Sequence, residues 1–148
     1  MRYEMYIGGY GKKSLARAEM EDGRIRVLER YEAANHSYLT IEGDCLYAVS
    51  ETPNGRVIGY SISADGALSR ASEAPTGGDD PCHVSVAGRT LLVSNYSSGS
   101  LARFELGKDG SIGRALPLIA RSGRGAKPER QECAHIHFAQ RTPGGWVA

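Results

Sequence analysis

The sequence has few cysteines, and they follow no pattern that marks a disulfide framework or a zinc site. Its 148 residues include three of them, Cys45, Cys82 and Cys133, which lie far apart and form no Cys-x-x-Cys pair. Small secreted domains and zinc modules carry closely spaced cysteines, usually in even numbers. We therefore predict reduced thiols and a cytoplasmic protein.

The chain also lacks an excess of charge of either sign and a long apolar run. Its 18 basic and 17 acidic residues leave a net charge of +1, whereas proteins that bind nucleic acid or anionic membranes carry a strong basic excess. No apolar run approaches the ~20 residues that a membrane span needs. Glu4 stands where a signal peptide would be apolar. We expect neither nucleic acid nor a membrane as a partner.

Proline is scarce, with 6 residues, but glycine is abundant. The 19 glycines are about 13% of the chain, nearly twice the usual ~7%. The hydrophobic fraction of 41% and the charged fraction of 24% are typical of a folded globular protein. Abundant glycine with little proline indicates many tight turns, and therefore many short strands.

An Asp-Gly pair recurs at a fixed distance along the chain. It stands at 22–23, 65–66 and 109–110, with spacings of 43 and 44 residues, and an aliphatic residue follows each glycine by two positions. Asp-Gly between alternating apolar segments is a strong hairpin signal, because glycine readily adopts the positive φ of the turn. The repeat predicts three similar hairpins.

Neighbouring segments match at the same period. Residues 46–51 align with 91–96 at a shift of 45, and residues 14–20 are a near-copy of 100–106. The composition of 14–20 favours a helix, but 100–106 alternates apolar and polar side chains as strands do. We let the repeat decide and predict strands in both places.

About four short strands in ~44 residues are typical of one β-propeller blade. We predict an all-β fold of antiparallel four-stranded blades near 5–35, 36–80 and 81–120, then a basic loop at 121–133 and a fourth blade from 134. A β-sandwich is the alternative. Three blades do not close a ring, so we expect 1–148 to be the N-terminal part of one propeller domain. Its open edge could pair with another chain.

Histidines mark the candidate site. In the repeat register, Tyr38, His83 and His137 take equivalent positions at the start of the first strand of a blade. Such positions face the central channel of a propeller or its mouth, where ligands bind. The structural alternative for His83 is that it satisfies backbone groups at a blade edge.

The densest polar cluster is 129–137, which contains His135 and His137 and follows a glycine-containing basic loop. Arginine binds carboxylate and phosphate through a planar fork, and histidine transfers protons near neutral pH. The pattern favours a small anionic ligand. The alternative is a solvated insertion whose charges serve solubility.

The sequence gives little indication of a metal site or of a bound cofactor. His135 and His137, two residues apart on a strand, could chelate, but no further histidine or carboxylate stands at a metal-ligand spacing. A nucleophilic Cys82 or Cys133 would need a base beside it, and small buried fillers fit them better. Phosphate-loop, nucleophile-elbow and dinucleotide motifs are missing from the sequence. We predict no metal and no cofactor.

Several segments resemble the seven-bladed β-propeller lactonase family, which includes the propeller-type bacterial 6-phosphogluconolactonases. The stretch 128–137 is similar to the family's Arg-Gln-x-x-x-His-x-His signature, and 91–100 to its Asn-Tyr-x-x-Gly-Ser segment. Residues 6–10 resemble its Gly-Thr-Tyr opening. The remaining matches are 35–39, 46–51 and 81–86. The resemblance spans the chain but only the first half of a typical member.

The resemblance implies a lactone hydrolase that converts 6-phosphogluconolactone to 6-phosphogluconate in the pentose phosphate pathway. A carboxymuconate-type lactonizing cycloisomerase, a non-catalytic binding module and an inactive fragment are the alternatives. The partner implied is a small anionic sugar lactone. The expected catalytic residues are His135, His137, Glu132 and Arg130. The expected substrate-binding residues are His83, Asn95, Tyr96, Gln131 and Lys12.

Overall fold

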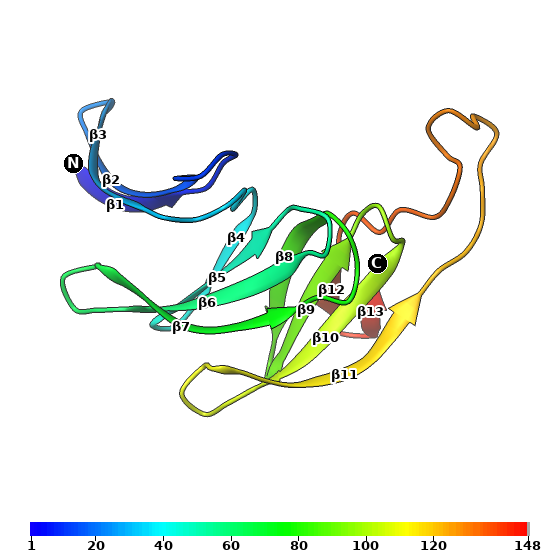
Figure 1. Ribbon diagram of the computed structural model, residues 1–148. Coiled ribbons are helices and arrows are strands. Elements are labelled where there is room, and N and C mark those ends of the chain that lie inside the picture. The colour runs from blue at the N-terminus through cyan, green and yellow to red at the C-terminus, as the bar shows by residue number, and fades with distance from the viewer. Residues whose placement is uncertain (148) are drawn as a thin grey trace.

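The chain folds into β-strands joined by tight turns (Figure 1). A computed structural model describes residues 1–147, and Ala148 lies outside the described residues. Within 1–147 there are thirteen strands and no helix, and all strand pairs are antiparallel. A helix long and apolar enough to cross a membrane is accordingly not found in this part of the chain.

The strands form three sheets and a final hairpin, each from consecutive strands. The first sheet contains β1 (Arg2–Ile7), β2 (Leu15–Glu21) and β3 (Arg24–Tyr31). The second contains β4 (Leu39–Glu42), β5 (Cys45–Ser50), β6 (Arg56–Ile62) and β7 (Leu68–Pro75). The third contains β8 (Pro81–Ala87), β9 (Thr90–Asn95), β10 (Ser100–Leu106) and β11 (Ile112–Ala120). The hairpin is β12 (Gln140–Thr142) and β13 (Gly145–Val147).

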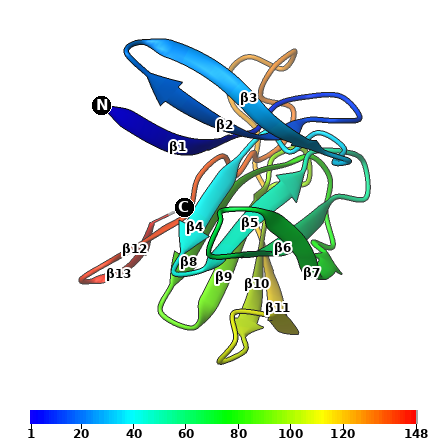
Figure 2. The same ribbon diagram turned by 90° about the vertical axis from the view of Figure 1, so that its left-hand side faces the viewer.

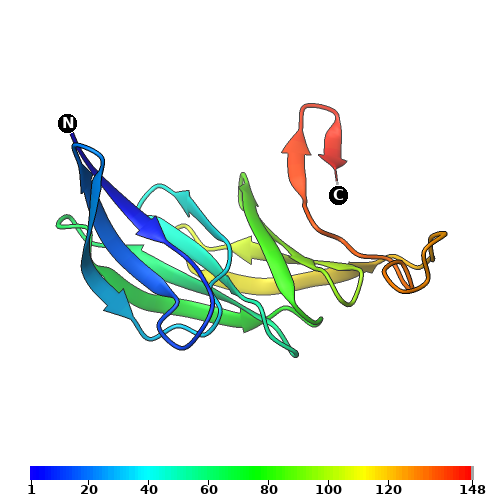
Figure 3. The same cartoon turned by 90° about the horizontal axis from the view of Figure 1, so that it is seen from above.

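The sheets follow one another as blades of part of a β-propeller ring. Seen from above, they fan out in chain order (Figure 3). Figure 2 shows the β4–β7 sheet between the other two. The first strands β4, β8 and β12 contact one another in sequence. The all-β propeller prediction is thus confirmed, with one difference: the first sheet has three strands instead of four.

The repeated Asp-Gly pairs form the turns of the β2–β3, β6–β7 and β10–β11 hairpins. Their glycines have φ values of +77°, +80° and +78°, a region that side chains other than glycine enter at a cost. Two of the turns also join neighbouring sheets. The hydroxyl of Tyr6 donates to the Gly66 carbonyl (2.7 Å) and that of Tyr47 to the Gly110 carbonyl (2.6 Å).

The hydrophobic core lies between the sheets rather than within any one of them. Leu15 of the first sheet packs with Leu46 and Ile58 of the second, and Val49 of the second packs with Leu91 of the third. All five side chains are almost fully buried. Each blade therefore depends on its neighbours for burial, as repeat architectures require.

Glycines allow the chain to pass closely from blade to blade. A Cβ on Gly8 would overlap the His36 carbonyl oxygen, and one on Gly99 would overlap the Ala134 carbonyl oxygen. In both places a turn of one blade meets the segment that enters the next. No side chain fits there, because the obstructing atoms belong to backbone.

Candidate functional site

Residues 134–139 carry the histidine pair along the side of β8. The hydroxyl of Ser85 donates to the Ala139 carbonyl at 2.6 Å, and the Ala139 N–H donates to His83 Nδ1 at 3.5 Å. Ile136 and Ala139 are buried against Leu92 and other side chains of the third sheet. This packing positions His135 and His137 at the start of the next blade.

The hairpin register corrects the predicted equivalence of His137 with Tyr38 and His83. The pair that closes the turn is Glu42–Cys45 in the β4–β5 hairpin, Ala87–Thr90 in β8–β9 and Thr142–Gly145 in β12–β13. The residues four positions before the first member of each pair are Tyr38, His83 and Phe138. Phe138, and not His137, is therefore the equivalent of Tyr38 and His83. The loop at 121–133 interrupts the period, which is why sequence spacing alone placed position 137 one residue off.

Three rings at these equivalent positions form a ladder across the first strands. The ring centroid of His83 lies 4.5 Å from that of Tyr38 and 4.6 Å from that of Phe138. Burial is the main cause that lowers the pKa of His83 below its usual 6.5, and the neighbouring His137 lowers it further. The ring of His83 is thus held as the neutral imidazole at neutral pH.

The lowered pKa makes stability depend on pH. Below pH 6.5 the unfolded chain binds a proton at His83 that the folded chain resists, so the free energy of unfolding falls as the pH drops. The slope from one group is at most about 1.4 kcal/mol per pH unit. We expect urea unfolding of His83→Gln to show a flatter decline between pH 7 and pH 5 than the wild type. An unchanged slope would contradict this assignment.

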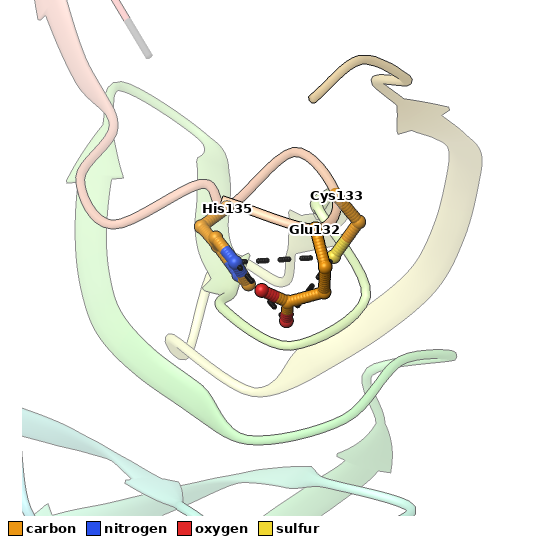
Figure 4. A group of neighbouring side chains, drawn as sticks. All are labelled: Glu132, Cys133 and His135. Atoms are coloured by element: carbon orange, nitrogen blue, oxygen red, sulfur yellow. Dashed lines mark hydrogen bonds and ion pairs between the residues drawn. The ribbon is translucent and has the colours of Figure 1, made fainter. Parts of the chain in front are cut away.

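His135 has its ring held in place from three directions. Its Nδ1–H donates to the Tyr96 carbonyl at 3.0 Å, and the two rings stack with centroids 4.4 Å apart at 16°. Its Nε2 lies 3.6 Å from Glu132 Oε1, and the two side chains point toward one another in Figure 4. Because a carbonyl can only accept, Nδ1 carries the proton and Nε2 keeps a lone pair.

Tyr96 and Glu132 contact this imidazole, and His137 joins the group through the Tyr96 ring. His137 is exposed and meets the Tyr96 ring edge-on, with centroids 5.6 Å apart. Glu132 is exposed on the loop that leads into the site. The structure therefore brings together four of the residues expected at the site, with His83 close to His137.

Arg130 and Gln131 lie on the exposed basic loop, which projects away from the sheets as the orange segment of Figure 1. The backbone N–H of Arg130 donates to the Lys127 carbonyl at 3.0 Å. The side chain of Gln131 accepts from the Lys127 N–H at 3.1 Å. Gln131 thus closes a turn of its own loop, whereas a sugar-binding role was expected.

Asn95 and Lys12 lie elsewhere than expected. Asn95 is 0% exposed, and its amide donates to Ser100 Oγ at 3.0 Å. It holds the interior of the third blade, where no sugar hydroxyl can reach it. Lys12 lines a cavity of about 370 Å³ with His36 and residues of the first two sheets. The lining described for this cavity does not include Glu132, His135 or His137.

Cys82 does not have the character of a nucleophile. Burial above all, and then the charge of Glu51, raise the pKa of its thiol to about 11. Its sulfur lies 3.6 Å from the His137 carbonyl oxygen, to which the thiol donates. A thiolate, the reactive form, is therefore scarce at neutral pH. The prediction of a small filler agrees with this environment.

Glu51, whose charge acts on the Cys82 thiol, belongs to a polar group that was not predicted from sequence. Glu51 accepts from the hydroxyls of Tyr10 (3.0 Å) and Ser37. The corrected register offers a sequence signal for this group, because Ser37, which contacts Glu51, is equivalent to Cys82 and His137. A polar residue or a thiol occupies this position in each of the three hairpins compared, β4–β5, β8–β9 and β12–β13.

Comparison with known proteins agrees with this architecture. The model of the family described as "Lactonase, 7-bladed beta-propeller" matches residues 4–148. A 6-phosphogluconolactonase of Bacillus subtilis is 30% identical over 96% of this chain and 44% of its own length. A 6-phosphogluconolactonase of Formosa agariphila is 29% identical over 79% of this chain and 36% of its own length.

Among solved structures, a periplasmic gluconolactonase of Pseudomonas aeruginosa superposes with a TM-score of 0.90. Its sequence identity is 27%, over 98% of this chain and 46% of that protein. The chain spans less than half the length of the relatives it matches. With the family model matching nearly every residue, the chain belongs to the seven-bladed β-propeller lactonase family.

Proposed function

We propose that the protein carrying this chain hydrolyses a sugar lactone, with 6-phosphogluconolactone as the substrate. The names of the Bacillus and Formosa relatives support the reaction class and the substrate. The basic loop favours a substrate that carries a phosphate over an uncharged lactone, because it has four basic and only two acidic side chains between 121 and 133. Arg130 is the basic residue of that loop nearest in sequence to the histidines.

The observation that carries the proposal is the fixed tautomer of His135. Its Nδ1–H is engaged by the Tyr96 carbonyl, so the lone pair of Nε2 is available to accept a proton. Glu132, 3.6 Å away, favours the imidazolium that forms. A half-buried imidazole of known tautomer beside a carboxylate is suited to general-base catalysis.

The reaction balances with these groups. A water oxygen attacks the lactone carbonyl carbon while His135 Nε2 accepts the water proton. The tetrahedral intermediate collapses, the bond from carbon to the ring oxygen breaks, and the imidazolium returns the proton to that oxygen. Arg130 stabilises the developing oxyanion once its exposed loop folds toward the histidines, and the half-buried Tyr96 contacts the sugar. His83 is 5% exposed between two rings and supports the site from beneath.

A coupled assay tests the proposal directly. Freshly made 6-phosphogluconolactone is supplied to the full-length protein, and 6-phosphogluconate is measured by its enzymatic oxidation, with the spontaneous hydrolysis subtracted. We expect an enzyme-dependent rate and a higher kcat/KM than for unphosphorylated gluconolactone. A rate no faster than spontaneous hydrolysis with both lactones would refute lactonase activity. Equal kcat/KM values would refute only the role of the phosphate.

A further inference from the structure

Three potential metal-ligand atoms converge at the entrance to the fourth blade (Figure 4). Cys133 Sγ lies 3.9 Å from His135 Nε2 and 4.0 Å from Glu132 Oε1, and the carboxylate lies 3.6 Å from the imidazole nitrogen. We propose that Glu132, Cys133 and His135 bind one zinc-like divalent cation.

The separations suit such an ion. Zinc bonds of about 2.3 Å to sulfur and about 2.0 Å to nitrogen or oxygen, in a tetrahedral arrangement, place ligand atoms roughly 3.4–3.6 Å apart. The three observed separations are longer by only a few tenths of an ångström. Small rotations of the exposed Glu132 side chain and of Cys133 bring the atoms into bonding range.

The kinds of ligand indicate which metal is favoured. A thiolate and an imidazole prefer zinc and its neighbours in the first transition row, whereas magnesium and calcium require oxygen ligands. Three protein ligands from a four-residue stretch leave a fourth position for water or another small ligand, as in zinc sites that are not purely structural. The site is therefore expected to exchange its metal.

The surroundings of His135 supply an independent argument. Its Nδ1–H donates to the Tyr96 carbonyl, which directs the Nε2 lone pair toward Cys133 and Glu132. Metal-bound histidines commonly have this outer hydrogen bond, which fixes tautomer and ring orientation. Stacking on Tyr96 restricts the ring further. The imidazole of His135 is thus already oriented for metal binding before a metal is present.

This set differs from the chelate considered from sequence. That chelate paired His135 with His137, but His137 lies edge-on to Tyr96 and is not among the three converging groups. Cys133, interpreted from sequence as a filler, supplies the third ligand instead. A cation on Nε2 would occupy the lone pair of the proposed base, so zinc inhibition is a further consequence that rests on the proposed function.

Cobalt provides a probe that does not depend on activity. The full chain, stripped with a chelator, is titrated with Co²⁺. We expect one equivalent to give a sulfur-to-cobalt charge-transfer band and the visible bands of tetrahedral cobalt, both removed by Zn²⁺. Cys133→Ser should abolish the charge-transfer band, and His135→Gln should weaken Co²⁺ binding at least tenfold. Cys45→Ser, the matched control, should leave the spectrum unchanged.

The contrary outcomes are equally definite. Absence of a thiolate band at saturating Co²⁺ would overturn the proposal, as would a band that survives in Cys133→Ser. A band that disappears in Cys45→Ser or Cys82→Ser would assign the metal to another thiol and also overturn it. Failure of lactone hydrolysis with an intact cobalt spectrum would count against the proposed function alone.

Discussion

Replacement of His135 by glutamine should reduce kcat for lactone hydrolysis by roughly 10²–10⁴-fold. The amide of glutamine can still donate to the Tyr96 carbonyl, as Nδ1 does now at 3.0 Å, so the local structure should persist. It cannot accept the water proton as a base. KM should change little, because the loss concerns the transition state rather than substrate binding. Steady-state kinetics by the coupled assay measure both parameters.

His137→Gln is the matched control. Its ring is exposed and meets Tyr96 only by an edge, and we expect kcat to fall less than tenfold. Far-UV circular dichroism verifies that both variants are folded. If His137→Gln abolishes activity while His135→Gln retains it, the base is His137 and our assignment is wrong.

Gly99→Ala should destabilise the protein by roughly 4 kcal/mol or more. Two costs combine at this position. Gly99 has a φ of +55°, which strains any residue with a Cβ, and that Cβ would overlap the Ala134 carbonyl oxygen. Ala134 precedes His135, so relief of the overlap shifts the segment that carries the site. Urea unfolding measures the loss of stability.

Gly77→Ala separates the two costs. Gly77 has a φ of +70°, but a Cβ there would meet no atom within 4 Å. Only the backbone strain applies, and we expect a loss of about 1 kcal/mol. Equal losses in the two variants would show that the contact with Ala134 contributes nothing to the rigidity of the blade junction.

The fold was largely readable from sequence because its signals are local and repeated. Each Asp-Gly pair specifies a hairpin by its own turn chemistry, and the near-copy of 14–20 at 100–106 corrected a misleading helical composition. The three-stranded first sheet was not predicted. The period gives the length of a unit, but strand pairing decides how many strands that unit contributes.

The site was readable only in part, because its geometry depends on register and burial. His135, Tyr96 and Glu132 do meet, but the irregular loop shifted the assignment of His137 by one position. Asn95 appears in a polar motif yet is completely buried. Sequence reveals that a residue can form hydrogen bonds, whereas only packing decides which groups it reaches.

The placement of the core between consecutive sheets has a consequence for synthesis on the ribosome. Each sheet is built from one contiguous stretch, and the second and third sheets each bury apolar side chains against the sheet made just before them. A nascent chain can therefore bury its blades in the order in which they leave the exit tunnel. Slow translation through the irregular stretch at 121–133 would give the three preceding sheets time to pack before the histidine segment emerges.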